Sequence, residues 1–167
     1  MLYFLIFLII VAGDQALKWW TVQNLALYES APLLPGVVEL RYIQNTGGGW
    51  SILSEHTWLL SVFTAVIVIA LTALMLLRIV RHSVGLTACT MLVAGGVGNL
   101  IDRVLLGYVV DMFHFEFWQS YPVFNIADIF VVAGMILGSF YYLFLYDKYD
   151  APKKETADGT DDPSEHK

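Results

Sequence analysis

The chain has 167 residues, of which 57% are hydrophobic and 14% are charged, and its formal net charge is −6. An average soluble domain has about 25% charged residues, so the composition indicates a protein whose solvent is mostly lipid. Residues 147–167 hold seven of the fifteen acids and four of the nine bases, which leaves eight acids and five bases in the rest of the chain. Nucleic-acid binding is therefore disfavoured, because the chain has no basic surface for it.

The first segment, Leu2 to Ala12, is apolar and is followed by Asp14 and then by Lys18-Trp19-Trp20. An apolar run of this length that ends in small residues is compatible with a cleavable signal peptide. However, no basic residue precedes the run, and the two tryptophans are typical of the interface of a membrane span. We therefore expect an uncleaved first transmembrane helix that continues past Asp14. Asp14 and Lys18 lie one helical turn apart, a spacing that suits a snorkelling ion pair near the interface.

The next region, residues 21–57, contains Pro32, Pro35 and three consecutive glycines at 47–49, so we expect a loop outside the bilayer. Within it, apolar and polar residues alternate along 38–43, which predicts a strand of a small β element. The segment from Trp58 to Leu77 then has twenty residues without a charge, enough for a helix of about 30 Å that crosses the hydrocarbon core.

Two further long apolar stretches predict spans at 84–101 and 123–146. Residues 104–122 connect them outside the bilayer, and the aromatic segment 113–118 is compatible either with a lid or with a belt at the lipid surface. The four spans are expected to form one domain, residues 1–146. Residues 147–167 are charged and without apolar periodicity, which predicts a disordered tail.

The distribution of basic residues predicts how the spans are oriented. One side of the expected membrane carries Arg78, Arg81, Lys148, Lys153 and Lys154, and the other carries Lys18, Arg41 and Arg103. The positive-inside rule therefore places both termini and the basic loop 78–82 in the cytoplasm.

An otherwise apolar chain gathers polar side chains between residues 95 and 128, namely Asn99, Asp102, Arg103, Asp111, Asn125 and Asp128. A charged side chain in the hydrocarbon core costs about 2.5 to 3.5 kcal/mol on insertion scales, so such residues usually face a bundle interior and mark a functional site. Asp102 and Asp128 each lie eighteen residues from the cytoplasmic end of their expected span. That distance is about 27 Å along a helix, which places both near the outer interface, where water can reach them.

Two carboxylates in one site cannot both ionise readily, so one stays protonated while the other acts as a base. Such a pair can activate water and protonate a leaving amine. We predict that Asp111 and Asp128 form this pair in a membrane-embedded protease. The sequence leaves open that each is a separately solvated interfacial residue, because they come from different segments.

The remaining polar residues of the cluster share helix faces. Asn99 stands three residues before Asp102 and four before Arg103, and Asn125 stands three before Asp128. One interpretation is a polar shell that orients the pair and binds the substrate backbone. The other is that these amides and charges join helices without touching a substrate, and for Asp102 and Arg103 a supporting role is at least as well favoured as catalysis.

Other chemistries are disfavoured. The histidines show no metal-ligand spacing, no GxSxG element occurs, and Cys89 has no histidine nearby. The glycines at 95–98 lie inside an apolar span, where a phosphate-binding loop would be misplaced. An ion-coupled transporter is an alternative, although the polar residues gather near one face and no internal repeat is seen. Another alternative is a non-enzymatic scaffold protein with four spans, but it would not explain why the chain keeps Asp111 and Asp128, whose charged side chains are costly to place in a membrane.

Five motifs follow one another along the chain: Asp14-Gln15 with Lys18, Asn45-Thr46-Gly47, Gly95-Gly96-Val97-Gly98-Asn99-Leu100-Ile101-Asp102-Arg103, Gly107-Tyr108-Val109-Val110-Asp111, and Phe124-Asn125-Ile126-Ala127-Asp128. With these motifs and spacings, the chain before its tail resembles the lipoprotein signal peptidases (signal peptidase II), a bacterial family of intramembrane aspartyl proteases. Two features depart from the family pattern. Gly48-Gly49-Trp50 stands where the family commonly has Ala, Ala or Ser, and Phe, and the acidic tail lies outside the resemblance.

The resemblance implies an all-α membrane protein with four transmembrane helices, a small extracytoplasmic β-sheet cradle and an outer lid. It implies catalytic roles for Asp111 and Asp128. It implies binding or supporting roles for Asn45, Gly47, Asn99, Arg103, Asn125, Asp14, Lys18 and Asp102. The implied reaction removes the signal peptide of a prolipoprotein just before its diacylglyceryl-modified cysteine, in the bacterial cytoplasmic (inner) membrane. No metal or organic cofactor is implied, and globomycin is the implied inhibitor.

Overall fold

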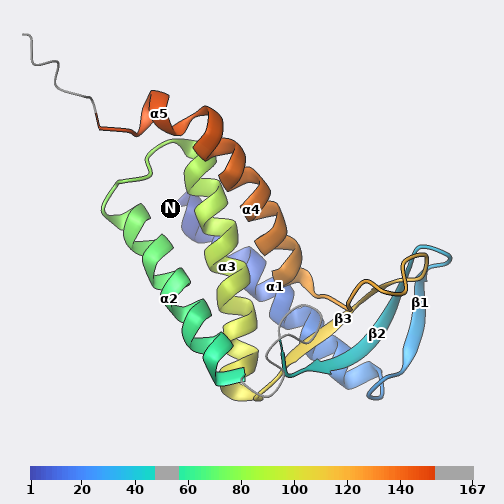
Figure 1. Ribbon diagram of the computed structural model, residues 1–167. Coiled ribbons are helices and arrows are strands. Elements are labelled where there is room, and N and C mark those ends of the chain that lie inside the picture. The colour runs from blue at the N-terminus through green and yellow to red at the C-terminus, as the bar shows by residue number, and fades with distance from the viewer. Residues whose placement is uncertain (48–56, 153–167) are drawn as a thin grey trace, which may run out of the picture.

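The protein is a helical bundle with a small sheet at one end, seen in the computed structural model of Figure 1, which describes residues 1–47 and 57–152. The described elements are α1 (Leu2–Asn24), β1 (Ser30–Leu34), β2 (Val38–Asn45), α2 (Thr57–Leu76), α3 (Ser83–Leu105), β3 (Val109–Phe115), α4 (Ile126–Phe144) and α5 (Tyr146–Tyr149). Residues 48–50, where the sequence departs from the family pattern, lie outside the described part.

The four long helices α1 to α4 are each apolar enough to cross a membrane, with 23, 20, 23 and 19 residues. At 1.5 Å per residue these lengths correspond to about 28 to 35 Å, which matches the hydrocarbon core. The four expected spans and the helical membrane fold are therefore confirmed. α1 runs through Asp14 without a break. α3 continues past the expected end at residue 101 to Leu105, and α4 begins at Ile126 instead of residue 123.

α3 is the central helix of the bundle and contacts α1, α2 and α4. Small residues along it allow this close approach, as is common where transmembrane helices meet. At Gly95 an added Cβ would collide with the backbone carbonyl of Ala127 in α4. α2, by contrast, has no fully buried residue, so much of its apolar surface is left for lipid. The packing thus ties the start of α4 tightly to the polar end of α3.

The three strands form an antiparallel sheet in the order β1-β2-β3. It lies beside the end of the bundle where α1 ends and α4 begins (Figure 1). Its core is a cluster of buried side chains: Leu25, Leu40, Tyr42, Val110 and Met112. β3 also touches α1 and α3, so the sheet and the bundle are joined directly. Asp111 lies on β3 and is held against the helix ends by this contact.

Several parts of the sequence-based description need correction or extension. The alternation at 38–43 lies within β2, but β1 and β3 were not predicted. The aromatic segment 113–118, expected as a lid or a belt, begins within β3, where Phe113 and Phe115 pack against Phe124. Both interpretations of this segment stay predictions. The expected tail from residue 147 lies mostly outside the described residues. Its first residues form the end of α5, and Asp150 is buried.

Candidate active site

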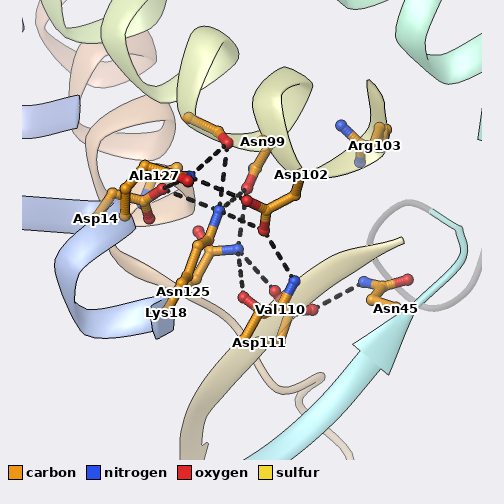
Figure 2. Close-up of polar contacts among 12 residues, drawn as sticks. Asp14, Lys18, Asn45, Asn99, Asp102, Arg103, Val110, Asp111, Asn125 and Ala127 are labelled. Carbon is orange, nitrogen blue, oxygen red and sulfur yellow. Dashed lines mark hydrogen bonds and ion pairs between the residues drawn. The ribbon is translucent and has the colours of Figure 1, made fainter. Parts of the chain in front are cut away.

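The polar residues singled out in the sequence come together where α3, the start of α4 and β3 meet (Figure 2). The two aspartates arrive from different elements, Asp111 from β3 and Asp128 from the first turn of α4. Both line one pocket of about 300 Å³. The alternative in which they are separately solvated residues therefore does not describe this geometry.

Asp128 is oriented by the way α4 begins. Asn125 is the N-cap of this helix, and its side-chain oxygen accepts a hydrogen bond from the backbone N–H of Asp128 at 2.9 Å. The Asp128 carboxylate in turn accepts from the backbone N–H of Asn125 at 3.2 Å, which completes a capping box. Its other oxygen accepts from the Asn99 amide at 2.7 Å. These contacts fix the orientation of the carboxylate in the pocket.

Asp111 is almost fully buried, with 2% of its surface exposed. One carboxylate oxygen accepts a hydrogen bond from the Asn125 amide at 2.7 Å, and the other accepts from the Asn45 amide at 2.9 Å. Burial, together with the negative charge of Asp128, raises the pKa of Asp111 to about 7, although the amide hydrogen bonds act in the opposite direction. Near neutral pH this carboxyl can therefore hold a proton.

Asn99 and Asn125 have side-chain amides whose orientation is determined by their neighbours. The Asn99 oxygen accepts from the Lys18 ammonium and from the Asn125 amide, both at 3.0 Å. The NH₂ group of Asn99 is therefore on the other side of the amide, where it donates a hydrogen bond to the Asp128 carboxylate. A single run of hydrogen bonds thus leads from Lys18 in α1 to Asp128, and the Asn125 amide links it to Asp111.

Lys18 lies between two carboxylates, at 2.9 Å from Asp14 and 3.0 Å from Asp102. The three side chains are 3%, 1% and 3% exposed. The expected ion pair between Asp14 and Lys18 is therefore confirmed, but the expectation that it snorkels to the interface is wrong, because both side chains are buried. Asp102 supplies a second negative partner, so the ammonium is compensated inside the protein and has no need to reach the interface.

The same carboxylates anchor neighbouring backbone. Asp14 accepts a hydrogen bond from the Ala127 N–H in the first turn of α4 at 2.8 Å, and Asp102 accepts from the Val110 N–H of β3 at 3.0 Å (Figure 2). Gln15 donates to Asp102 at 3.0 Å and to Asp14 at 3.2 Å. The cluster thereby holds the two segments that carry the catalytic candidates. Gln15 was not among the predicted site residues, although it directly follows Asp14 in the first motif.

Arg103 also lines the pocket, and its side chain reaches towards Gly47. An Arg103 guanidinium nitrogen is 3.5 Å from the carbonyl of Gly47, a long contact, and the Gly47 N–H donates to the Asn45 side chain at 2.9 Å. The Arg103 Nε is buried and has no hydrogen-bond partner among the described residues. Within residues 1–47 and 57–152, no group of three or more His, Cys, Asp or Glu side chains is arranged to hold a metal ion.

A family model described as "Signal peptidase (SPase) II" matches residues 6–144. The chain belongs to this peptidase family. The match spans all four membrane helices and the sheet, and every residue discussed in this site falls within it. The protein is therefore a multi-pass membrane protein of the signal peptidase II family.

Individual relatives agree with the family assignment. The lipoprotein signal peptidase of Enterococcus faecalis (strain ATCC 700802 / V583) is 40% identical over 161 residues, which cover 95% of each chain. That of Streptococcus pyogenes serotype M2 is 39% identical over 137 residues, covering 81% of this chain and 89% of the relative. A solved structure described as a bacterial membrane enzyme, at 2.3 Å resolution, superposes with a TM-score of 0.79 at 30% identity over 92% of this chain and 93% of the other. A second such structure, at 1.9 Å, has a TM-score of 0.78.

The five motifs identified in the sequence are spread along the chain but meet in this site. All five converge on this region: the first supplies Lys18, the second Asn45, the third Asn99, and the last two Asp111 and Asp128. Each motif contributes at least one hydrogen bond or ion pair to the network described above.

Proposed function

We propose that this protein is an aspartyl endopeptidase that removes the signal peptide of prolipoproteins, cutting on the N-terminal side of the diacylglyceryl-modified cysteine. The observation that carries the proposal is the pair of carboxylates, Asp111 and Asp128, in one pocket at the end of a transmembrane bundle. The names of the relatives supply the substrate class. A lipid-modified substrate suits this position, because its acyl chains would stay in the bilayer while the peptide bond reaches the pocket.

The chemistry follows from a pair of carboxyls that share one proton. The ionised member removes a proton from a water molecule, whose oxygen then attacks the scissile carbonyl carbon. The protonated member hydrogen-bonds to the developing oxyanion. When the C–N bond breaks, the leaving amine takes up a proton from the dyad. The elevated pKa of Asp111 supports its role as the member that begins with the proton.

The neighbouring residues would hold the dyad and the substrate. Asn99, Asn125 and Asn45 donate hydrogen bonds to the two carboxylates and so favour one arrangement of their oxygens. The Arg103 guanidinium, whose Nε has no hydrogen-bond partner among the described residues, would bind a substrate carbonyl. The buried charge cluster would act indirectly, by holding Asn99 and the backbones of β3 and α4 in place; it consists of Asp14, Lys18 and Asp102.

We further propose that the protein lies in the bacterial cytoplasmic (inner) membrane as one peptidase domain, residues 1–146, with both termini in the cytoplasm. Arg78 and Arg81 follow α2 and Lys148 lies in α5, at the bundle end opposite the sheet (Figure 1). This orientation puts the sheet and the dyad on the extracytoplasmic side. Globomycin would bind at the same pocket.

The test is cleavage by the purified full-length protein in liposomes. One substrate is a diacylglyceryl-modified prolipoprotein, and the matched control is the same precursor without the lipid. Mass spectrometry of the product identifies the cut bond. We expect only the modified precursor to be cut, with the modified cysteine as the new N-terminus, and globomycin to block the reaction. Equal cleavage of both precursors, or a cut at another bond, would overturn the proposal.

A further inference from the structure

A second cavity opens next to the dyad pocket, on the side of the β sheet. Its volume is about 480 Å³, within the range of small-ligand sites. It is bounded by β2, by His114 of β3 and by the segment that leads from β3 towards α4. Both cavities share a wall made by Asn45, Asp111, Tyr121, Pro122 and Val123. A chain bound with its scissile bond at Asp111 can therefore extend from one cavity into the other.

The two cavities differ in chemical character. The dyad pocket continues along the membrane-spanning part of α4, past Val131, Val132 and Met135. The second cavity is lined by hydrogen-bonding side chains, among them Arg41, Gln44, His114, Gln119 and Ser120. An apolar wall at membrane depth suits acyl chains or an apolar signal sequence. The polar cavity suits the peptide that follows the modified cysteine, because that peptide leaves the membrane for water.

Arg41 gives the second cavity a positive charge without an ion-pair partner among the described residues. Its Nε is buried without a hydrogen-bond partner among the described residues, and no carboxylate in that part of the chain lies within ion-pair distance of it. The nearest acid along the same strand, Glu39, is already engaged, since its carboxylate lies 2.9 Å from the His114 ring nitrogen. A buried donor without a partner is costly, and a guanidinium matches a carboxylate in shape and charge. Arg41 therefore lacks an anionic group that a ligand would supply.

We infer that this second cavity binds the first residues after the modified cysteine of the substrate, and that Arg41 favours a substrate with an acidic side chain there. The inference rests on the proposed function, since it needs the scissile bond at Asp111. Arg41 acts here as a specificity residue, and it does not touch the reacting atoms. Its effect should appear mainly in KM, with kcat changed little.

The test compares three diacylglyceryl-modified prolipoprotein peptides that differ only at the residue after the modified cysteine, which is aspartate, serine or lysine. Wild-type protein is measured beside Arg41→Glu and Arg41→Gln. The matched control is Arg78→Glu, which changes an exposed arginine far from the sheet. Partly exposed ion pairs contribute up to about 1 kcal/mol, which corresponds to roughly a fivefold change in affinity. We expect wild type to prefer the aspartate peptide over the lysine peptide by about that factor in kcat/KM.

Arg41→Glu should reverse this preference, and Arg78→Glu should keep it. If Arg41→Glu does not fold, as judged by gel filtration and thermal unfolding, Arg41→Gln decides, because it should bring the ratio close to one. An aspartate-to-lysine ratio that is the same in wild type and in the folded Arg41 variant would overturn the inference while leaving the peptidase assignment intact. A wild-type protein that cuts none of the three peptides would instead overturn the proposed function, and the assignment of this cavity with it.

Discussion

Replacing Lys18 with methionine removes the charge that compensates two buried carboxylates while keeping a side chain of similar length. The ammonium lies 2.9 Å from Asp14 and 3.0 Å from Asp102, and all three side chains are almost inaccessible. At an effective dielectric constant of about 20, Coulomb's law gives roughly 6 kcal/mol of attraction for each contact before desolvation is counted. Removing one member of a buried ion pair typically costs about 3 to 5 kcal/mol, because the partner charge is left unpaired. We expect Lys18→Met to lower the free energy of unfolding by about that amount.

The assay is unfolding of the purified protein in detergent, followed by circular dichroism. The control is Lys148→Met, which removes an exposed lysine in α5 and should change stability by no more than about 0.5 kcal/mol. A second variant, Lys18→Met combined with Asp102→Asn, should recover part of the loss, because one unpaired charge is removed. If Lys18→Met lowered the free energy of unfolding no more than Lys148→Met does, the ion pairs of Lys18 with Asp14 and Asp102 would not stabilise the protein, and their burial would have been misjudged.

Three further predictions concern the dyad and the helix contact beneath it. Because the pKa of Asp111 is raised to about 7, its proton is present at lower pH and is lost as the pH rises through that value. Cleavage should therefore decline above about pH 7, and a rate that stays flat up to about pH 9 would contradict this. Asn99→Ala removes the amide that donates a hydrogen bond to Asp128, so kcat should fall by about ten- to a hundredfold. A fall in kcat of less than about twofold would show that this hydrogen bond does not contribute to catalysis. Gly98→Ala would put a methyl group 2.7 Å from the Asp14 carboxylate and should destabilise the protein by about 1 to 3 kcal/mol. The control is Gly13→Ala, which should not destabilise the protein, because an added Cβ there meets nothing within 4 Å. Equal shifts in melting temperature for the two variants would refute the close packing at Gly98.

The membrane helices were predictable because uninterrupted apolar length is a strong signal. Residues 58–77 were expected as a span, and α2 covers Thr57–Leu76. The strands were harder to predict. β3 is buried along most of its length, so it has no alternation of polar and apolar residues to recognise, and only β2 had such a pattern.

In the site, contacts within one segment could be predicted from the sequence, whereas contacts between distant segments could not. Helical spacing correctly puts Asn125 and Asp128 on one turn, where they form the capping box. No local pattern predicts that β3 brings Asp111 to that turn, because the contact depends on how the sheet packs against the bundle. The burial of Lys18 was also missed. Its second partner, Asp102, lies on another helix, and from Asp14 alone an interfacial pair was the reasonable expectation.

The aspartyl mechanism is tested most directly by cleavage of a diacylglyceryl-modified prolipoprotein by Asp111→Asn and Asp128→Asn, each compared with wild type in liposomes. Asp147→Asn, an exposed acid in α5, is the matched control. Thermal unfolding and gel filtration must first show that each variant is folded, because both aspartates accept structural hydrogen bonds. If Asp111 and Asp128 form the catalytic dyad, wild type and Asp147→Asn should cleave while both folded dyad variants are inactive. Near-normal cleavage by either folded dyad variant would contradict the aspartyl mechanism.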